Sequence, residues 1–179
     1  MVGIKLNSVE FQAGNFSVEE YRELYNALGD EGQFDFVEPS GGTYELLAFG
    51  HKRESTKKRE AFFLECAGAI VPGLRKTKTY VTGGFRTVGA IFEARKTVDR
   101  VGFARIVCQE FHFCKNILDG KITGAIDQKL DQKLDQNNFG LTNVAAGTQI
   151  RQVSNDEEPI DLSKQENVEA FLKDMGTWA

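Results

Sequence analysis

The chain has 179 residues, of which 41% are apolar and 27% charged, so it can build a folded core and does not have the composition of a disordered chain. At this length one domain of ordinary size is expected. The net charge of -4 and the pI near 5.3 provide no broad basic field, which argues against binding to nucleic acid or to an anionic membrane surface.

The sequence carries no pattern typical of export or of membrane insertion. Its start, MVGIKLNS, lacks the basic leader and the apolar run of a secretory signal. No stretch approaches the roughly 18 apolar residues that a membrane span needs. We therefore expect a soluble protein of the cytoplasm.

The cysteine pattern favours reduced thiols. Cys66, Cys108 and Cys114 are an odd set, which is not typical of a disulfide framework. Cys108, His112 and Cys114 lie close in sequence, but the spacing C-x3-H-x-C matches no common zinc pattern and lacks a fourth ligand. We expect core thiols here and no metal site.

The first elements are predicted from apolar spacing and capping residues. Residues 2–6 (VGIKL) are expected to form a short strand. In FSVEEYRELYNALGDEG, Ser17 can cap the first amides of a helix and Glu20 completes a capping box. Apolar residues then recur at helical spacing, and Gly29 or Gly32 can end the helix.

Three further strands follow in the first two thirds of the chain. They are predicted at residues 34–39 (FDFVEP), 78–83 (KTYVTG) and 99–103. Helices are predicted between them at residues 55–71 and 86–97. Short strands that alternate with helices are typical of a parallel sheet, so the predicted fold class is α/β.

After Gly120 the chain becomes polar, rich in amides and weakly periodic. The tetrad QKLD occurs twice in tandem within residues 128–135. A last helix is predicted near the carboxyl terminus, with Ser163 as its cap and Glu166 at the third helical position. Its apolar residues form one stripe, which favours core packing: Val168, Phe171, Leu172 and Met175.

Two predicted strand ends carry small residues followed by an arginine. Gly83 and Gly84 precede a predicted helix, and Arg86 comes directly after that turn. In VGFAR, Arg105 follows the next strand. Free amides at a helix start and a nearby guanidinium suit a phosphate, and neighbouring strand ends can share one. The alternatives are a plain turn at the two glycines and a surface ion pair at Arg105.

Four motifs, in this order and spacing, resemble the old yellow enzyme family of FMN-dependent NADH:flavin oxidoreductases, in its fungal branch: VGIKLNS, FDFVEPSGGTYE, TYVTGGFRT and DRVGFAR. The resemblance covers nearly the whole chain and implies the C-terminal half of a (β/α)8 TIM barrel, about four parallel strands with helices. It implies FMN as cofactor, NADH or NADPH as reductant and a small-molecule acceptor such as an electron-poor alkene. The half barrel is expected at residues 1–122, with a tail and terminal helix at 123–179.

The resemblance also implies cofactor-binding residues. Lys5 stands where the family usually has an arginine beside the flavin pyrimidine ring, and it keeps the charge but not the fork. Gly83 and Gly84 match the phosphate-binding turn after the seventh strand of the family. Ala104 and Arg105 match the Gly-Arg pair after the eighth, with alanine in place of glycine.

Catalytic residues are not assigned from the sequence. The family grips the substrate oxygen with a histidine pair or a His-Asn pair, and neither His51 nor His112 lies in that motif. The alternative function is a truncated half barrel without catalysis, a phosphate-binding or self-associating remnant. Such a half barrel exposes two strand edges and the inner face of its sheet, which favours a homo-oligomer.

Overall fold

A computed structural model describes residues 1–9, 17–31, 34–41, 64, 67–68, 71–74, 76–129 and 139–176. The chain forms two compact units, Met1–Phe103 and Ala104–Ala179, and each is described by itself. The expected division at residue 122 between a family region and a tail stays a prediction.

The chain begins with strand β1 (Gly3–Val9) and helix α1 (Val18–Glu31). The predicted capping box is confirmed, because the Ser17 amide donates to Glu20 Oε2 at 2.6 Å and the Glu20 amide donates to Ser17 Oγ at 3.2 Å. The helix continues past Gly29, which was expected as a possible end. An added Cβ at Gly29 would lie 2.8 Å from Leu74 Cδ2, so the glycine permits close packing there.

The remaining elements of the first unit alternate strand and helix. They are β2 (Phe36–Gly41), the 3-10 turn η1 (Val71–Gly73), β3 (Lys78–Thr82), α3 (Val88–Ala94) and β4 (Arg100–Gly102). The helix predicted at residues 55–71 falls mostly outside the described residues. The predicted strands at 34–39, 78–83 and 99–103 correspond to β2, β3 and β4.

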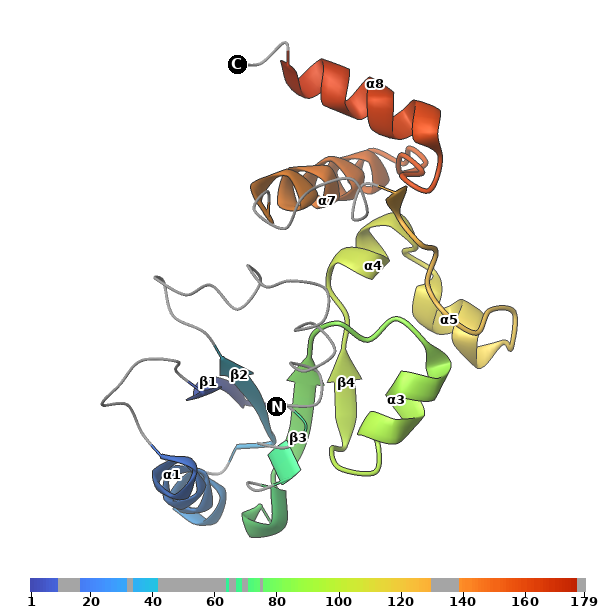
Figure 1. Cartoon of the computed structure of the whole chain (residues 1–179). Coiled ribbons are helices and arrows are strands. Elements are labelled where there is room, and N and C mark those ends of the chain that lie inside the picture. The colour runs from blue at the N-terminus through green and yellow to red at the C-terminus, as the bar shows by residue number, and fades with distance from the viewer. Residues whose placement is uncertain are drawn as a thin grey trace. The chain divides into compact units, whose positions relative to one another are not determined.

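The four strands form one parallel sheet in the order β1-β2-β3-β4 (Figure 1). The α/β class and the parallel sheet are therefore confirmed. Each strand lies beside the next one in the chain, without the reversal of strand order that a doubly wound sheet shows. Connections between neighbouring parallel strands are right-handed. When each connection also leads to the next strand in the same direction across the sheet, the connecting helices lie on one face of the sheet. This is the arrangement of part of a TIM barrel.

The covered face of the sheet carries two small cores. Beside β1 and β2, the first contains the buried residues Tyr21, Tyr25 and Val37, with Ile4, Leu6 and Leu74 against them. Beside β3 and β4, the second contains Ala67, Val81, Phe85, Ala94 and Val98. Val37 pairs with Thr79, which is two residues from Val81 and so on the same face. Helices α1 and α3 therefore cover one common face.

Alternation along the strands sends the other side chains to the opposite face, called the open face below. It carries Lys5 from β1, Phe36 and Glu38 from β2, and Tyr80 from β3. The rings of Phe36 and Tyr80 lie 4.9 Å apart between centroids. In a closed barrel this face would be the interior.

The second unit is helical and contains α4 (Arg105–Gln109), α5 (Phe113–Leu118), α7 (Phe139–Ser154) and α8 (Gln165–Gly176). Much of the polar segment that follows Gly120 is thus a folded helix, which the sequence did not predict. The apolar stripe predicted for α8 is confirmed, since it packs with Ala145 of α7 and with Leu162. Ser163 is not the predicted cap, because α8 begins at Gln165 and Lys164 directly precedes it. The Ser163 hydroxyl instead donates to Asp161 Oδ1 at 2.6 Å.

A buried amide joins the parts of the second unit. Gln109 Oε1 accepts from Gln128 Nε2 at 2.8 Å, from Gln149 Nε2 at 3.1 Å and from the Leu162 amide at 3.3 Å. Its own Nε2 donates to Asp161 Oδ1 at 3.0 Å. The Asp161 carboxylate accepts hydrogen bonds from the hydroxyl and the amide of Ser163, which lower its pKa, whereas partial burial raises it. The hydrogen bonds have the larger effect, so the pKa of Asp161 lies below its usual value. Satisfied polar groups of this kind fix one arrangement of the helices.

Within the part of the chain that the structure describes, no helix has the length and apolar character needed to cross a membrane.

A carboxylate clamp ties β3 to β4. Asp99 Oδ2 accepts from the amide and the hydroxyl of Thr79, both at 3.1 Å, and Oδ1 accepts from Lys78 Nζ at 2.9 Å. The Asp99 amide donates to Thr79 Oγ1 at 3.1 Å. Partial burial works against the charged carboxyl, but Lys78 and Thr79 outweigh it and hold the pKa of Asp99 below its usual value.

We predict that Asp99→Asn loosens the β3–β4 pair by about 1–2 kcal/mol at pH 7, because a hydrogen bond to a charged group is lost. The lowered pKa means that this stabilisation is present above about pH 4 and is lost as the pH falls through the folded-state pKa. Hydrogen exchange at the strand amides measures the effect. Glu93→Gln, in the exposed Glu93–Lys96 pair, is the matched control with a much smaller expected change. A difference between Asp99→Asn and wild type that persists at pH 2 would contradict this account.

Candidate functional site

The carboxyl ends of β3 and β4 lie side by side, because Thr82 pairs with Gly102. Directly after Thr82, Gly83 and Gly84 adopt φ values of 139° and 72°. Both values favour glycine, so the two glycines are required by the backbone of this turn. The turn is exposed, and an added Cβ at Gly83 would have no neighbour within 4 Å. The backbone here can therefore be approached closely from solvent.

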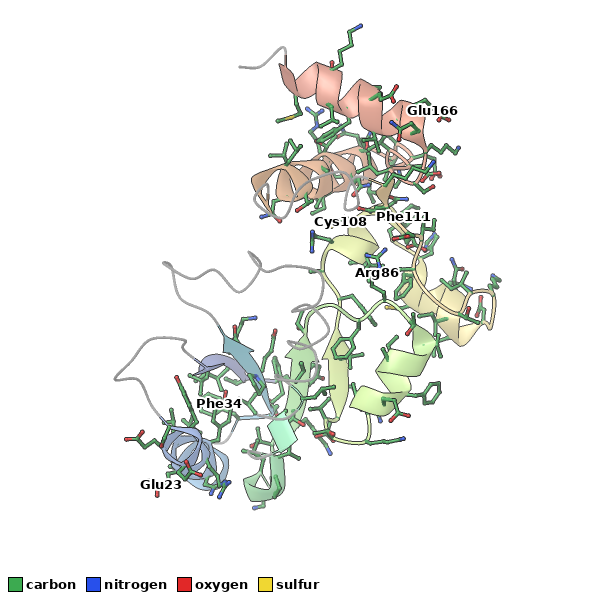
Figure 2. The ribbon with its side chains drawn as sticks, viewed as in Figure 1. Glu23, Phe34, Arg86, Cys108, Phe111 and Glu166 are labelled. Atoms are coloured by element: carbon green, nitrogen blue, oxygen red, sulfur yellow. The ribbon has the colours of Figure 1, made fainter. Side chains whose placement is uncertain are left out.

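The turn leads through a buried anchor into α3. Phe85 has an exposed fraction of 2% and packs in the core beneath α3. Arg86 lies in the same loop (Figure 2), and Thr87 caps the helix, since its hydroxyl accepts from the Ala90 amide at 3.1 Å. The two glycines thus have a structural role that does not depend on a ligand, because they allow Phe85 to enter the core.

Ala104 and Arg105 begin the second unit, where Ala104 is the residue before α4. Ala104 has a φ of -123°, outside the positive range that favours glycine. An alanine at this position therefore needs no left-handed backbone. Both residues are exposed. A cradle that joins them to Gly83 and Gly84 stays a prediction.

Lys5 lies on the open face and pairs with Glu38. The two residues are direct neighbours in the β1–β2 register, and Lys5 Nζ lies 2.9 Å from Glu38 Oε1. The side chain of Lys5 is 60% exposed and that of Glu38 is 21% exposed. The pair therefore presents an accessible ammonium held by a more sheltered carboxylate. Sequence reasoning named Lys5 but missed Glu38, because the contact depends on the register between two strands.

A hollow of about 430 Å³ lies at the amino ends of the strands. It is lined by Met1, Phe34, Asp35, Phe36, Lys76, Lys78 and Tyr80. Lys78 and Phe36 are the first residues of β3 and β2, so the hollow is at the end of the sheet away from the two-glycine turn. Ligands of parallel α/β folds gather at the carboxyl ends. We therefore assign the candidate site to the carboxyl ends and the open face beside them.

The remaining candidate residues that the structure describes are Cys108, Cys114 and His112. Cys108 lies on α4 (Figure 2). Burial raises the pKa of its thiol, and the charge of Arg105 offsets only part of this, so the thiol stays protonated at neutral pH. Cys114 and His112 are exposed. Among the described residues, no group of three or more His, Cys, Asp or Glu side chains could hold a metal ion. His51 and Cys66 lie outside the described residues.

The fold and the open face define an α/β protein with part of a parallel barrel, and known sequences give its relatives. The chain is 45% identical to the NADH-dependent flavin oxidoreductase nadA of Aspergillus parasiticus, over 99% of this chain and 39% of that protein. It is 37% identical to the NADH-dependent flavin oxidoreductase iccE of Talaromyces variabilis, over 58% of this chain and 27% of that protein. A third relative is the NADH-dependent flavin oxidoreductase iliE of Neonectria sp., 36% identical over 58% of this chain and 15% of that protein.

The chain is thus a homologue of fungal proteins named NADH-dependent flavin oxidoreductases, and the resemblance predicted from its motifs is confirmed at this level. It spans about two fifths of the length of the Aspergillus relative. No family model matches the chain.

We predict opposite effects for two glycine substitutions in the same stretch. Gly83→Ala should destabilise the first unit by about 1–3 kcal/mol, because an L-residue is strained at a φ of 139°. Gly89→Ala, in α3 with no atom within 4 Å of an added Cβ, should stabilise it by up to about 1 kcal/mol. Thermal unfolding of both variants measures the difference. Equal stability of the two would show that the turn does not need a glycine at position 83.

Proposed function

We propose that the chain is the cofactor-holding part of an FMN-dependent oxidoreductase of the old yellow enzyme type. Electrons would pass from NADH or NADPH through the flavin to a small-molecule acceptor such as an electron-poor alkene. The observation that carries the proposal is the 45% identity, over almost the whole chain, to a protein named NADH-dependent flavin oxidoreductase. A cytoplasmic location is part of the same proposal.

The donor set at the carboxyl ends fits FMN. The ligand has a phosphate at one end and, when reduced, an anionic pyrimidine ring at the other. Gly83 and Gly84 are exposed, and the open space beside Gly83 would let a phosphate approach the backbone closely. Arg105 would add a charge-assisted bond, with Ala104 contributing its amide. The ammonium of Lys5 on the open face suits the ring.

The protein's contribution would be position and electrostatics. When bound, FMN supplies the hydride chemistry. The Gly83–Gly84 turn is anchored by buried Phe85, so its amides are oriented before a ligand arrives. Lys5 places positive charge near the ring and thereby favours the reduced anionic form.

The direct test is purification of the chain with excess FMN, followed by its visible spectrum. A bound yellow flavin that bleaches on addition of NADH or NADPH under nitrogen is the expected result. A colourless protein at saturating FMN would contradict the proposal.

The phosphate assignment gives a comparison of two arginines. Arg105→Ala should weaken FMN binding about tenfold to a hundredfold, as expected for loss of a charge-assisted hydrogen bond of about 1.5–3 kcal/mol. Arg86→Ala is the matched control, with a change below about threefold. Fluorescence titration with FMN measures both, and riboflavin, which lacks the phosphate, should bind the two variants equally. Equal losses with FMN would show that Arg105 is not the phosphate partner.

A second candidate function is a non-catalytic half barrel that associates with itself. Within the described residues, β1 and β4 stand at the ends of the sheet and have one neighbouring strand each. Unpaired strand edges favour association with another copy. A colourless protein that runs as a defined dimer would support this candidate over the enzyme.

A further inference from the structure

The ion pair between Lys5 and Glu38 differs from an ordinary surface salt bridge. Both residues stand on the open face and are fixed opposite each other by the β1–β2 register. Glu38 is the more sheltered partner, with 21% of its side chain exposed against 60% for Lys5. The lysine therefore reaches across to a carboxylate that is more sheltered than its own ammonium. Long flexible side chains rarely gain such a fixed position at exposed sites.

A second ion pair of the first unit lies away from Lys5 and Glu38. At the amino ends of the strands, Lys78 pairs with Asp99, and Arg100 donates to the carbonyl of Asp99 at 2.8 Å. Lys5 and Glu38 lie further along the strands, toward the carboxyl ends, because Glu38 is two residues past Phe36. Along the strands, the Lys5–Glu38 pair therefore lies closer to the carboxyl ends than the Lys78–Asp99 pair does.

We propose that Glu38 is a positioning residue that sets where Lys5 places its ammonium and how much positive charge the flavin ring meets. The proposal rests on the FMN-binding function argued above. An ammonium has three donors, and the bond to Glu38 uses one, so two remain for the ring. The carboxylate also cancels much of the lysine's charge, which limits how strongly Lys5 favours the reduced anionic flavin.

The measurable quantity is the preference of the protein for reduced over oxidised FMN, obtained as the midpoint potential of the bound flavin. Glu38→Gln keeps an acceptor of the same length for Lys5 but removes the negative charge. Glu38→Gln should raise the preference for reduced over oxidised FMN about tenfold. This corresponds to a positive shift of about 30 mV in the midpoint potential of a two-electron couple. Lys5→Gln should lower the preference by a similar factor.

Two further variants make the result specific to this pair. The double variant Lys5→Gln/Glu38→Gln restores local neutrality and should return the preference to within about threefold of wild type. Glu93→Gln removes the same charge from an exposed helical pair on α3 and should leave the potential unchanged. A potential does not respond to a loss of stability alone, so a purely structural role of Glu38 would leave it where it was.

The outcomes separate the two proposals. If the wild-type chain binds no FMN, the proposed function fails and this inference fails with it. If wild type and Glu38→Gln bind FMN with the same potential, or if the shift is negative, the flavin function stands and the role of Glu38 is overturned. A shift in Glu93→Gln equal to that in Glu38→Gln would also overturn it, because the effect would then report net charge alone.

Discussion

The architecture of the first unit depends on the fixed hand of its strand crossovers. Each parallel strand lies beside its successor, so every connection runs in the same direction, and the described helices α1 and α3 pack on the same face. The face under α1 and α3 therefore carries the buried apolar side chains. The opposite face carries charged and aromatic side chains. The Lys5–Glu38 pair, the Phe36–Tyr80 contact and the adjacent strand ends all follow from this division.

Much of the fold could be predicted from the sequence, because local signals agree with the tertiary structure there. The capping box of Ser17 and Glu20 and the apolar stripe of α8 depend on residues a few positions apart. Helix α7 was missed because its core side includes Gln149, which is buried and pairs with another amide. The apolar periodicity of α7 is therefore interrupted at a buried, hydrogen-bonded amide.

The candidate site could be predicted only in part. Glycines in a turn and arginines after strands are visible in the sequence, and their motifs pointed to flavin oxidoreductases, the name that the homologues carry. Glu38 is not visible in this way, because its role depends on facing Lys5 across two strands whose register the sequence does not state. The phosphate cradle needs Ala104 and Arg105 as well as the two glycines, and it remains a proposal for titration to decide.

Burial of Phe85 directly after the two glycines has a consequence for how this edge of the sheet behaves. A glycine pair in open solvent acts as a hinge, yet here the next residue is locked among Val81, Ala94 and Val98. Swinging the turn outward would drag an aromatic ring into water, at a cost of about 2 kcal/mol or more. The glycines at these positions thus allow positive φ angles without making the turn mobile. The loop is expected to stay in one conformation and not to open and close over the site.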